Sequence, residues 1–307
     1  MLGNFKVDYS SETHHAWALE ALGHQVVRLQ EPRATAGQIL AEALKSDVFV
    51  WVHTHGWNTA GIEDVLTQLR GERIPVVAYH LDLYMGLQRW RTYEQDPYMR
   101  QIDHFFTVDR LMADWLNQNT PVRGHYITAA VHGPECTLAE RPSPLGNDVV
   151  FVGSRGYHPE WPYRRELVDW LGTTYGPRFT HIGGDGVGVV RGEALNRLYG
   201  SSQVVVGDSL CLNFDYPDYW SDRVFETLGR GGFMIHPYIK GMERVFEDRE
   251  HLVFYDFGDF DQLKKLVDYY LEHDAEREQI RLAGHEHVKA NHTYTARWKT
   301  ILDTVFP

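Results

Sequence analysis

Within positions 218–237 the sequence places a serine, an arginine and a glutamate where one short helix would present them together. Ser221 is predicted to cap this helix, and a buried strand is predicted over 233–236. A helix that begins at the open edge of a parallel sheet offers N–H groups and a positive dipole end, which suit a diphosphate. Arg223 can donate to the same diphosphate, and Glu226, one turn deeper, can accept from vicinal ribose hydroxyls. These side chains predict a nucleotide-binding site.

Four other polar or glycine-rich segments follow predicted strands, at 53–57, 80–82, 153–155 and 181–186. Ligands of open parallel sheets bind beyond the carboxyl ends of the strands, so each segment is a candidate binding loop. The glycines of the last segment would let the backbone come close to a base or a ribose.

The pattern Ser-x-Arg-x-Phe-Glu over 221–226, followed by two glycines, a strand and an acidic-aromatic stretch ending at Tyr255, resembles the CgeB-like branch of the GT-B glycosyltransferases. The resemblance implies an α/β fold of two Rossmann-like, doubly wound parallel-sheet domains facing a cleft. It also implies that Glu226 holds the donor ribose and that the preceding helix start holds the diphosphate. The wider retaining group has a glutamate eight positions before Glu226, where this sequence has Asp218.

The resemblance therefore implies a metal-independent hexosyl- or pentosyltransferase, with retention of configuration, that uses a UDP-linked nucleotide sugar and no cofactor. The residues expected to bind the donor are Gly153, Ser154, Gly183, Gly184, Asp218, Ser221, Asp222, Arg223 and Glu226. Those expected near the acceptor are Trp57, His80, Arg89 and Arg91. The expected catalytic residues are Asp82, His53 and His55 near the reacting hydroxyl, and Arg155 and Arg223 beside the leaving diphosphate.

Two other functions remain open. Residues i and i+2 of a strand point the same way, so His53 and His55 could share a metal with His80 and Asp82 in a metal-dependent hydrolase. The other hypothesis is a non-catalytic module that binds a nucleotide or a glycan.

The acceptor is expected to be a small molecule, a glycan or a modified DNA base. Segment 88–100 interleaves cations with aromatic residues, which favours an amphipathic helix packed on the core. The same pattern can also bind a phosphate backbone and stack on bases. In that case the acceptor would be a flipped 5-hydroxymethylpyrimidine in phage DNA.

Predicted strands alternate with predicted helices, which implies parallel sheets with helices on both sides. The first domain, the acceptor side, is expected over 1–135, beginning with strands over 6–9 and 24–29. A proline- and glycine-rich linker is expected to follow it. The nucleotide-sugar domain is expected over 148–290, and the terminal helix within 291–307 is expected to cross back to the first domain.

The composition is that of a globular protein with room for two domains: 307 residues, 43% hydrophobic and 23% charged. The net charge of −12 argues against a surface adapted as a whole to nucleic acid. The sequence has no apolar run of about 20 residues and no signal-peptide pattern, and Cys136 and Cys211 match no redox or metal spacing. A cytoplasmic location is therefore expected. The P-loop motif and the dinucleotide glycine fingerprint are both missing, which excludes those two classes.

Overall fold

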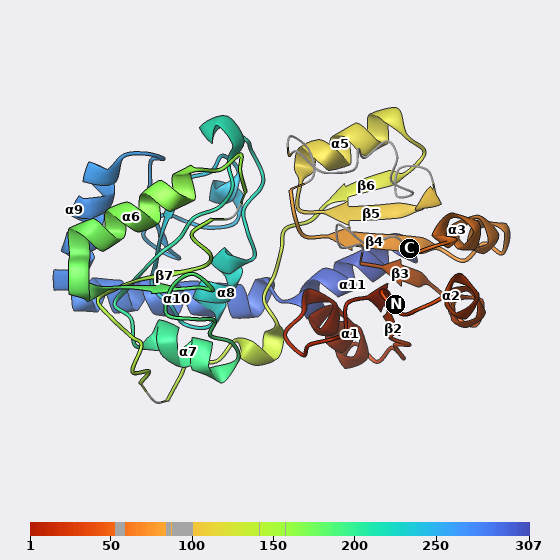
Figure 1. The fold of residues 1–307 in the computed structure, drawn as a ribbon, viewed down its shortest axis with the longest axis horizontal. Helices are drawn as coiled ribbons and strands as arrows, with labels where there is room; N and C mark the ends of the chain where they lie inside the picture. The colour runs from red at the N-terminus through yellow and green to blue at the C-terminus, as the bar shows by residue number, and fades with distance from the viewer. Residues whose placement is uncertain (53–58, 84–86, 88–100, 141, 157) are drawn as a thin grey trace. The chain divides into compact units, whose positions relative to one another are not determined.

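The computed structural model describes residues 1–52, 59–83, 87, 101–140, 142–156 and 158–307. The chain forms two compact units, Met1–Thr128 with Tyr294–Pro307, and Ala129–Thr293. Each unit has one parallel sheet covered by helices (Figure 1). The predicted fold class, two doubly wound α/β domains, is thus confirmed. The terminal helix lies in the first unit, and the segment expected to be a linker lies in the second.

The first unit contains, among the described residues, a sheet in the order β2-β1-β3-β4-β5-β6. Its strands are β1 (Leu2–Gly3), β2 (Leu29–Gln30), β3 (Phe49–Trp51), β4 (Val76–His80), β5 (His104–Thr107) and β6 (Arg123–Tyr126). Its helices are α1 (Ser11–Ala21), α2 (Ala36–Ala43), α3 (Ile62–Gly71), α5 (Arg110–Asn119) and α11 (Tyr294–Val305).

Strands β3, β4 and β5 are buried along their length, which explains their continuous apolar sequences. One face of the sheet packs on α2, α3 and α5 in a cluster that includes Trp51, Leu66 and Phe105. The opposite face packs on α1 and α11, where Tyr79 of β4 contacts both helices. The sheet is therefore enclosed between two helical layers.

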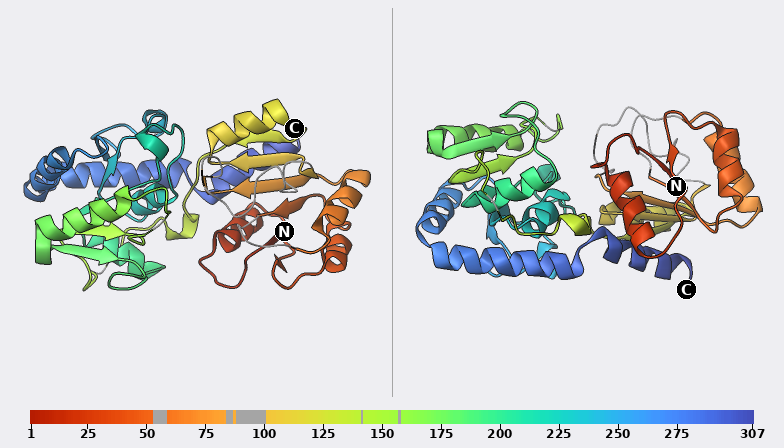
Figure 2. Two further views of the ribbon diagram at one scale, coloured as in Figure 1. Left: turned by 45° about the horizontal axis from the view of Figure 1, so that its top comes forward. Right: turned by 90° about the horizontal axis from the view of Figure 1, so that it is seen from below.

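The second unit contains, within the described part of the chain, a sheet in the order β11-β10-β9-β7-β8. Figure 2 gives two further views of its ribbon. Its strands are β7 (Val149–Val152), β8 (Phe179–Ile182), β9 (Val204–Val206), β10 (Met234–Pro237) and β11 (Val253–Tyr255). Its helices are α6 (Tyr163–Tyr175), α7 (Glu193–Gly200), α8 (Arg223–Gly229), α9 (Phe260–Glu272) and α10 (Asp274–Asn291). Because the first strand of the unit, β7, lies between the second and third, β8 and β9, the chain order reverses there, which makes β7/β9 a topological switch point.

The predictions for the first two strands are wrong. Residues 6–9 lie in a turn, and Ser10 after them donates its hydroxyl to the Asn4 carbonyl (2.6 Å) and accepts from the Thr13 N–H (3.2 Å). This side chain bends the segment back to cap α1. The strand expected over 24–29 begins only at Leu29, because its neighbour β1 is two residues long and offers no further ladder. Strand β6, with the sequence RGHY, was not predicted because it lacks an apolar pattern and is held by pairing with β5.

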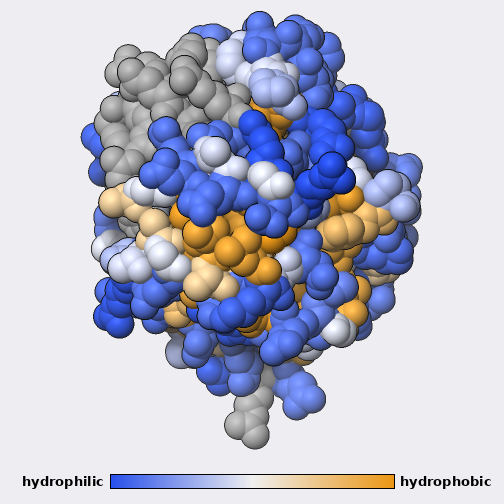
Figure 3. Space-filling view, turned by 90° about the vertical axis from the view of Figure 1, so that its right-hand side faces the viewer, coloured by the Kyte–Doolittle hydropathy of each residue, from blue (hydrophilic) through white to orange (hydrophobic). Residues whose placement is uncertain are grey.

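Of the helices in the described part of the chain, none combines the length and apolar composition that crossing a bilayer requires. Figure 3 shows one face of the molecule, where apolar surface forms a central area bordered by hydrophilic residues. Large exposed apolar side chains include Leu44 and Phe306. Such exposure is ordinary, because more than half of a soluble protein's surface is apolar.

The terminal helix is attached to α1 by a buried hydrogen bond. Trp298 Nε1 donates to His15 Nδ1 at 3.0 Å, and the His15 ring also packs on Tyr79 and Tyr294. Burial, with a smaller effect of neighbouring His14, lowers the pKa of His15 from 6.5 to about 3. His15 is therefore neutral in the folded protein, which keeps Nδ1 available as an acceptor.

Protonation of His15 should therefore oppose folding. Only the unfolded state takes up this proton between about pH 6.5 and pH 3, so the free energy of unfolding should fall as the pH falls through that window, by at most about 1.4 kcal/mol per pH unit from this group. In His15→Asn, whose amide oxygen can still accept from Trp298, we expect a shallower fall, measured by urea unfolding at pH 7, 6 and 5. Equal slopes for the two proteins would contradict this assignment.

Candidate functional site

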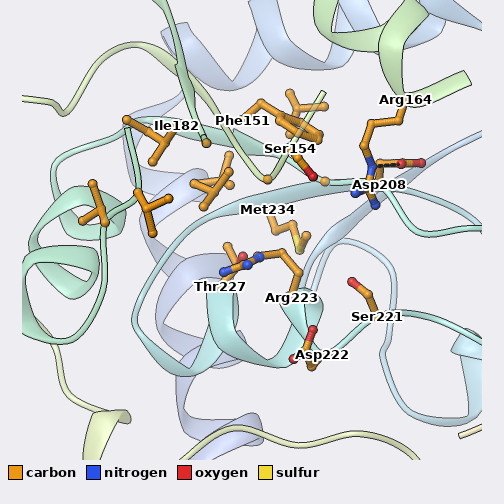
Figure 4. A pocket seen from close by; sticks show the side chains of 18 of the residues that line it. Phe151, Ser154, Arg164, Ile182, Asp208, Ser221, Asp222, Arg223, Thr227 and Met234 are labelled. Carbon is orange, nitrogen blue, oxygen red and sulfur yellow. Dashed lines mark hydrogen bonds and ion pairs between the residues drawn. The ribbon is translucent and has the colours of Figure 1, made fainter. Parts of the chain in front are cut away.

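A cavity of about 280 Å³ lies in the second unit at the carboxyl ends of β7, β8 and β9. Its walls come from the residues just after these strands and from the start of α8 (Figure 4). The position is the topological switch point, where open parallel sheets bind their ligands. Its volume is near the lower end of the range for small-molecule sites, about 300–1,000 Å³.

The loops after β7 and β8 approach each other closely because both contain glycine. A Cβ on Gly183 would lie 2.4 Å from the Gly153 carbonyl oxygen. That distance is too short for any side chain, so only glycine allows the two loops to pack this way. Main-chain atoms of Gly153 and Gly183 therefore form this part of the cavity wall.

A buried ion pair forms the charged wall of the cavity. Arg164 of α6 donates its Nε–H to the Asp208 carboxylate at 2.7 Å, and Trp161 Nε1 donates to the same carboxylate at 3.0 and 3.2 Å. Burial raises the pKa of Asp208, and the Arg164 charge and the hydrogen bonds from Arg164 and Trp161 oppose that rise. Both Arg164 and Asp208 line the cavity, so a guanidinium is held beside it by a fixed partner.

Arg223, the first residue of α8, supplies a second cation. It lines the cavity and donates from Nη1 to Glu226 Oε2 at 2.5 Å. Burial lowers the pKa of Arg223, but Glu226, Tyr199 and Asp222 together outweigh this effect and the pKa is raised. Arg223 is therefore a permanent cation, and Glu226 holds it.

The start of α8 is fixed by a chain of hydrogen bonds to β10. The Ser221 N–H donates to Ser209 Oγ (3.1 Å), and Ser209 lies 3.0 Å from His236 Nε2. His236 Nδ1 lies 2.7 Å from the Pro237 carbonyl, which requires an Nδ1–H donor and leaves Nε2 to accept from Ser209. Burial lowers the pKa of His236 to about 4, consistent with that neutral form. His236 thus positions the cavity wall.

The prediction that Ser221 caps α8 is wrong. The cap residue is Asp222, and its side chain makes no capping hydrogen bond. The Ser221 hydroxyl is buried, lines the cavity and has no hydrogen-bond partner among the described residues. Ser221 immediately precedes the cap residue, and its N–H is bound to Ser209. Its hydroxyl lines the cavity instead of capping the helix.

The structure brings most of the expected donor-binding residues together. Those that line the cavity are Gly153, Ser154, Gly183, Gly184, Ser221, Asp222 and Arg223. The two others are engaged elsewhere, Asp218 with Arg244 and Glu226 with Arg223. Arg155, which was expected to be catalytic, is paired with Asp169.

The expected acceptor-side residues belong to the first unit. His80, at the end of β4, is buried and donates from Nδ1 to the Asp82 carbonyl at 3.0 Å. His53, His55, Trp57, Arg89 and Arg91 lie outside the described residues. Among the residues that are described, no three His, Cys, Asp or Glu side chains gather as a metal site would require.

Four polar or charged cavity residues were missed by the sequence analysis: Arg164, Arg191, Asp208 and Thr227. Asp208 comes shortly after the apolar run Val204–Val206, so the rule that ligands bind at carboxyl ends could have found it. Arg164 carried no such signal, because its partner is 44 positions away. Thr227 lies in the helix predicted to carry Arg223 and Glu226, but it was not itself singled out as a site residue.

A second cavity, of about 910 Å³, lies in the first unit near the residues that precede β2 and β3. Its lysines already have acidic partners, Lys45 with Glu42 and Lys299 with Asp303. It therefore has neither the position nor the free charge expected of a nucleotide site.

The fold and the site can now be compared with known proteins. The glycosyl transferase-like family matches residues 146–303, more than half of the chain. The chain belongs to this glycosyltransferase family. The matched residues include every wall of the cavity in the second unit. No curated protein matches the sequence.

Solved structures agree with the family. HepE from Anabaena in complex with UDP and glucose has a TM-score of 0.67 and 12% identity, covering 99% of this chain and 98% of that chain. A glycosyltransferase from Rickettsia africae has a TM-score of 0.60 and 12% identity, covering 99% and 96%. Sucrose-phosphate synthase from Thermosynechococcus elongatus has a TM-score of 0.53 and 14% identity, covering 80% and 71%. At these identities the likeness shows the fold, and it confirms that this glycosyltransferase is of the GT-B class.

The buried ion pair of this glycosyltransferase should be far more important to stability than an exposed one. Asp208→Asn leaves the Arg164 charge buried without its counter-ion, so the free energy of unfolding should fall by about 3 kcal/mol. The matched control is Asp169→Asn, whose exposed pair with Arg155 should contribute less than about 1 kcal/mol. Urea unfolding of the three proteins measures both effects, and equal losses would refute the importance of burial.

Proposed function

We propose that this chain transfers a sugar from a UDP-linked nucleotide sugar to an acceptor hydroxyl, with retention of configuration. The observation that carries the proposal is the cavity at the β7/β9 switch point, where arginine side chains, among them Arg164 and Arg223, line the cavity together with glycine backbone. The complexes of HepE with UDP-glucose and of the pneumococcal O-GlcNAc transferase GtfA with UDP and GlcNAc support a donor of this kind.

The cavity offers different chemistry at its two ends. Ser154, Arg164 and Asp208 lie toward one end, and Ile182 lies toward the other (Figure 4). The charged end suits a diphosphate, and the apolar end suits a nucleoside. This polarity matches a nucleotide sugar better than it matches a free glycan.

Departure of the nucleoside diphosphate is the step that most needs stabilisation, because negative charge develops on the leaving oxygen. Arg164 and Arg223 can donate charge-assisted hydrogen bonds to that oxygen and its neighbours, and the Ser221 hydroxyl can add another. These cations can supply the neutralisation that a divalent metal gives in other transferases, so we propose that transfer is metal-independent. Arg155 could contribute only after its side chain leaves Asp169.

Glu226 is proposed to accept hydrogen bonds from the donor ribose. In the structure its carboxylate is bound to Arg223, so ribose binding would require Glu226 to share or release that guanidinium. The released guanidinium would remain next to the cavity. The acceptor is proposed to bind on the first unit, with Asp82 near the reacting hydroxyl.

Release of UDP from a panel of UDP-sugars, with chelator present, tests the proposal. Arg223→Met should lower kcat by on the order of 10²-fold, the usual cost of removing one donor to a developing anion. The matched control is Arg178→Met, which removes an exposed guanidinium paired with Asp148 away from the cavity and should leave the rate unchanged. Wild-type protein that binds UDP but never releases it from any donor would instead indicate a non-catalytic nucleotide-binding module.

Comparing the binding of uridine and of UDP separates ribose binding by Glu226 from its ion pair with Arg223. If Glu226 binds the ribose, Glu226→Ala should weaken binding of both uridine and UDP, measured by calorimetry. If Glu226 only positions Arg223, the variant should weaken UDP binding and leave uridine binding unchanged. We expect the first result, and the second would remove Glu226 from the donor site.

A further inference from the structure

Thr227 of α8 lines the cavity, and its side-chain hydroxyl makes no hydrogen bond to the described residues. The residue is 0% exposed, and within the described part of the chain its Oγ1 has no hydrogen-bond partner. Threonines in helices usually donate this hydroxyl to the carbonyl four residues earlier. Thr67, Thr173 and Thr300 do so, at 2.8, 2.9 and 3.2 Å.

A buried hydroxyl without a partner destabilises the fold, because it has lost its hydrogen bonds to water and gained none in return. Most buried polar side-chain atoms in native proteins have a hydrogen-bond partner, so each exception needs an explanation. Valine has the same shape and would not carry this cost. The orientation of Thr227 into the cavity therefore indicates that a ligand completes its hydrogen bonding.

The surroundings of Thr227 differ from those of Arg164 and Asp208 at the opposite end of the cavity. Thr227 and Tyr199 both approach Gly232, and Tyr199 belongs to an apolar cluster with Ile182 and Val205. In Figure 4, Thr227 and Ile182 lie toward one end of the cavity, away from Arg164 and Asp208, and the Arg223 guanidinium lies beside Thr227. A neutral hydroxyl between apolar side chains and the Arg223–Glu226 ion pair, where the ribose is proposed to bind, suits a nucleoside, whose base and ribose carry neutral donors and acceptors.

We propose that the Thr227 hydroxyl hydrogen-bonds to the nucleoside half of the donor and is a specificity-determining residue of the site. This inference rests on the proposed nucleotide-sugar function. It assigns nucleoside recognition to a neutral side chain, whereas the guanidinium groups recognise the diphosphate.

The test is Thr227→Val, because the two expected effects have opposite signs. Without ligand the variant should gain stability, with a Tm about 2–4 °C higher, since an unpaired buried hydroxyl is removed. Its affinities for uridine and for UDP should both fall, by the same factor of about 3 to 10. If Thr227 had only a structural role, Thr227→Val would not both raise the stability of the protein and lower its affinity for uridine and UDP.

Two further variants make the result specific. Thr227→Ser retains the hydroxyl and should keep the uridine affinity within about twofold of wild type. Thr173→Val removes an exposed helical hydroxyl that is already paired, and should leave uridine affinity unchanged without raising the Tm.

The outcomes separate this inference from the function on which it rests. Wild-type protein that binds UDP, together with a Thr227→Val variant of unchanged uridine and UDP affinity, would overturn the role of Thr227 alone. A loss confined to UDP would also overturn it, because the hydroxyl would then contact the phosphates. Wild-type protein that binds neither uridine nor UDP would overturn both proposals.

Discussion

The reversal of strand order between β7 and β9 is the constraint on which the candidate site depends. The chain leaving β7 turns toward β8, and the chain leaving β9 turns toward β10, so the two connections diverge and leave a gap at the sheet edge. Residues from three strand ends reach this gap without being neighbours in sequence. Gly183 keeps the gap narrow, because its missing side chain lets the Gly153 carbonyl come close.

The buried pair of Arg164 and Asp208 converts this gap into a charged site. An arginine beside a low-dielectric cavity would lose much hydration, and the carboxylate with its additional Trp161 hydrogen bond offsets that loss. The guanidinium is therefore fixed before any ligand arrives. Charge that is already oriented needs little reorganisation when an anion binds or forms, which is the physical basis of electrostatic catalysis.

The features that could be predicted from the sequence are those encoded locally. Strand β7 was predicted because a run of apolar residues indicates burial on both faces, and its loop was singled out because ligands bind at carboxyl ends. Interactions between distant residues could not be predicted. Arg164 became a buried cavity residue only through Asp208, and Ser221 was displaced from the cap position by a bond to Ser209. The strand predicted over 6–9 is wrong for a related reason. Ser10 bends this segment through a hydrogen bond to Asn4 that the sequence pattern does not reveal.

Arg223 and Glu226 present the least expected arrangement, because two groups proposed to bind different halves of one ligand are bound to each other. The pair satisfies both charges while the site is empty, so neither group is left desolvated and unpaired. A ligand that offers only a ribose must compete with Arg223 for the carboxylate, and one that offers only a phosphate must compete with Glu226 for the guanidinium. A nucleoside diphosphate replaces both interactions at once. For a donor bound as proposed, the internal ion pair makes recognition of the two halves cooperative and favours the complete donor over its fragments.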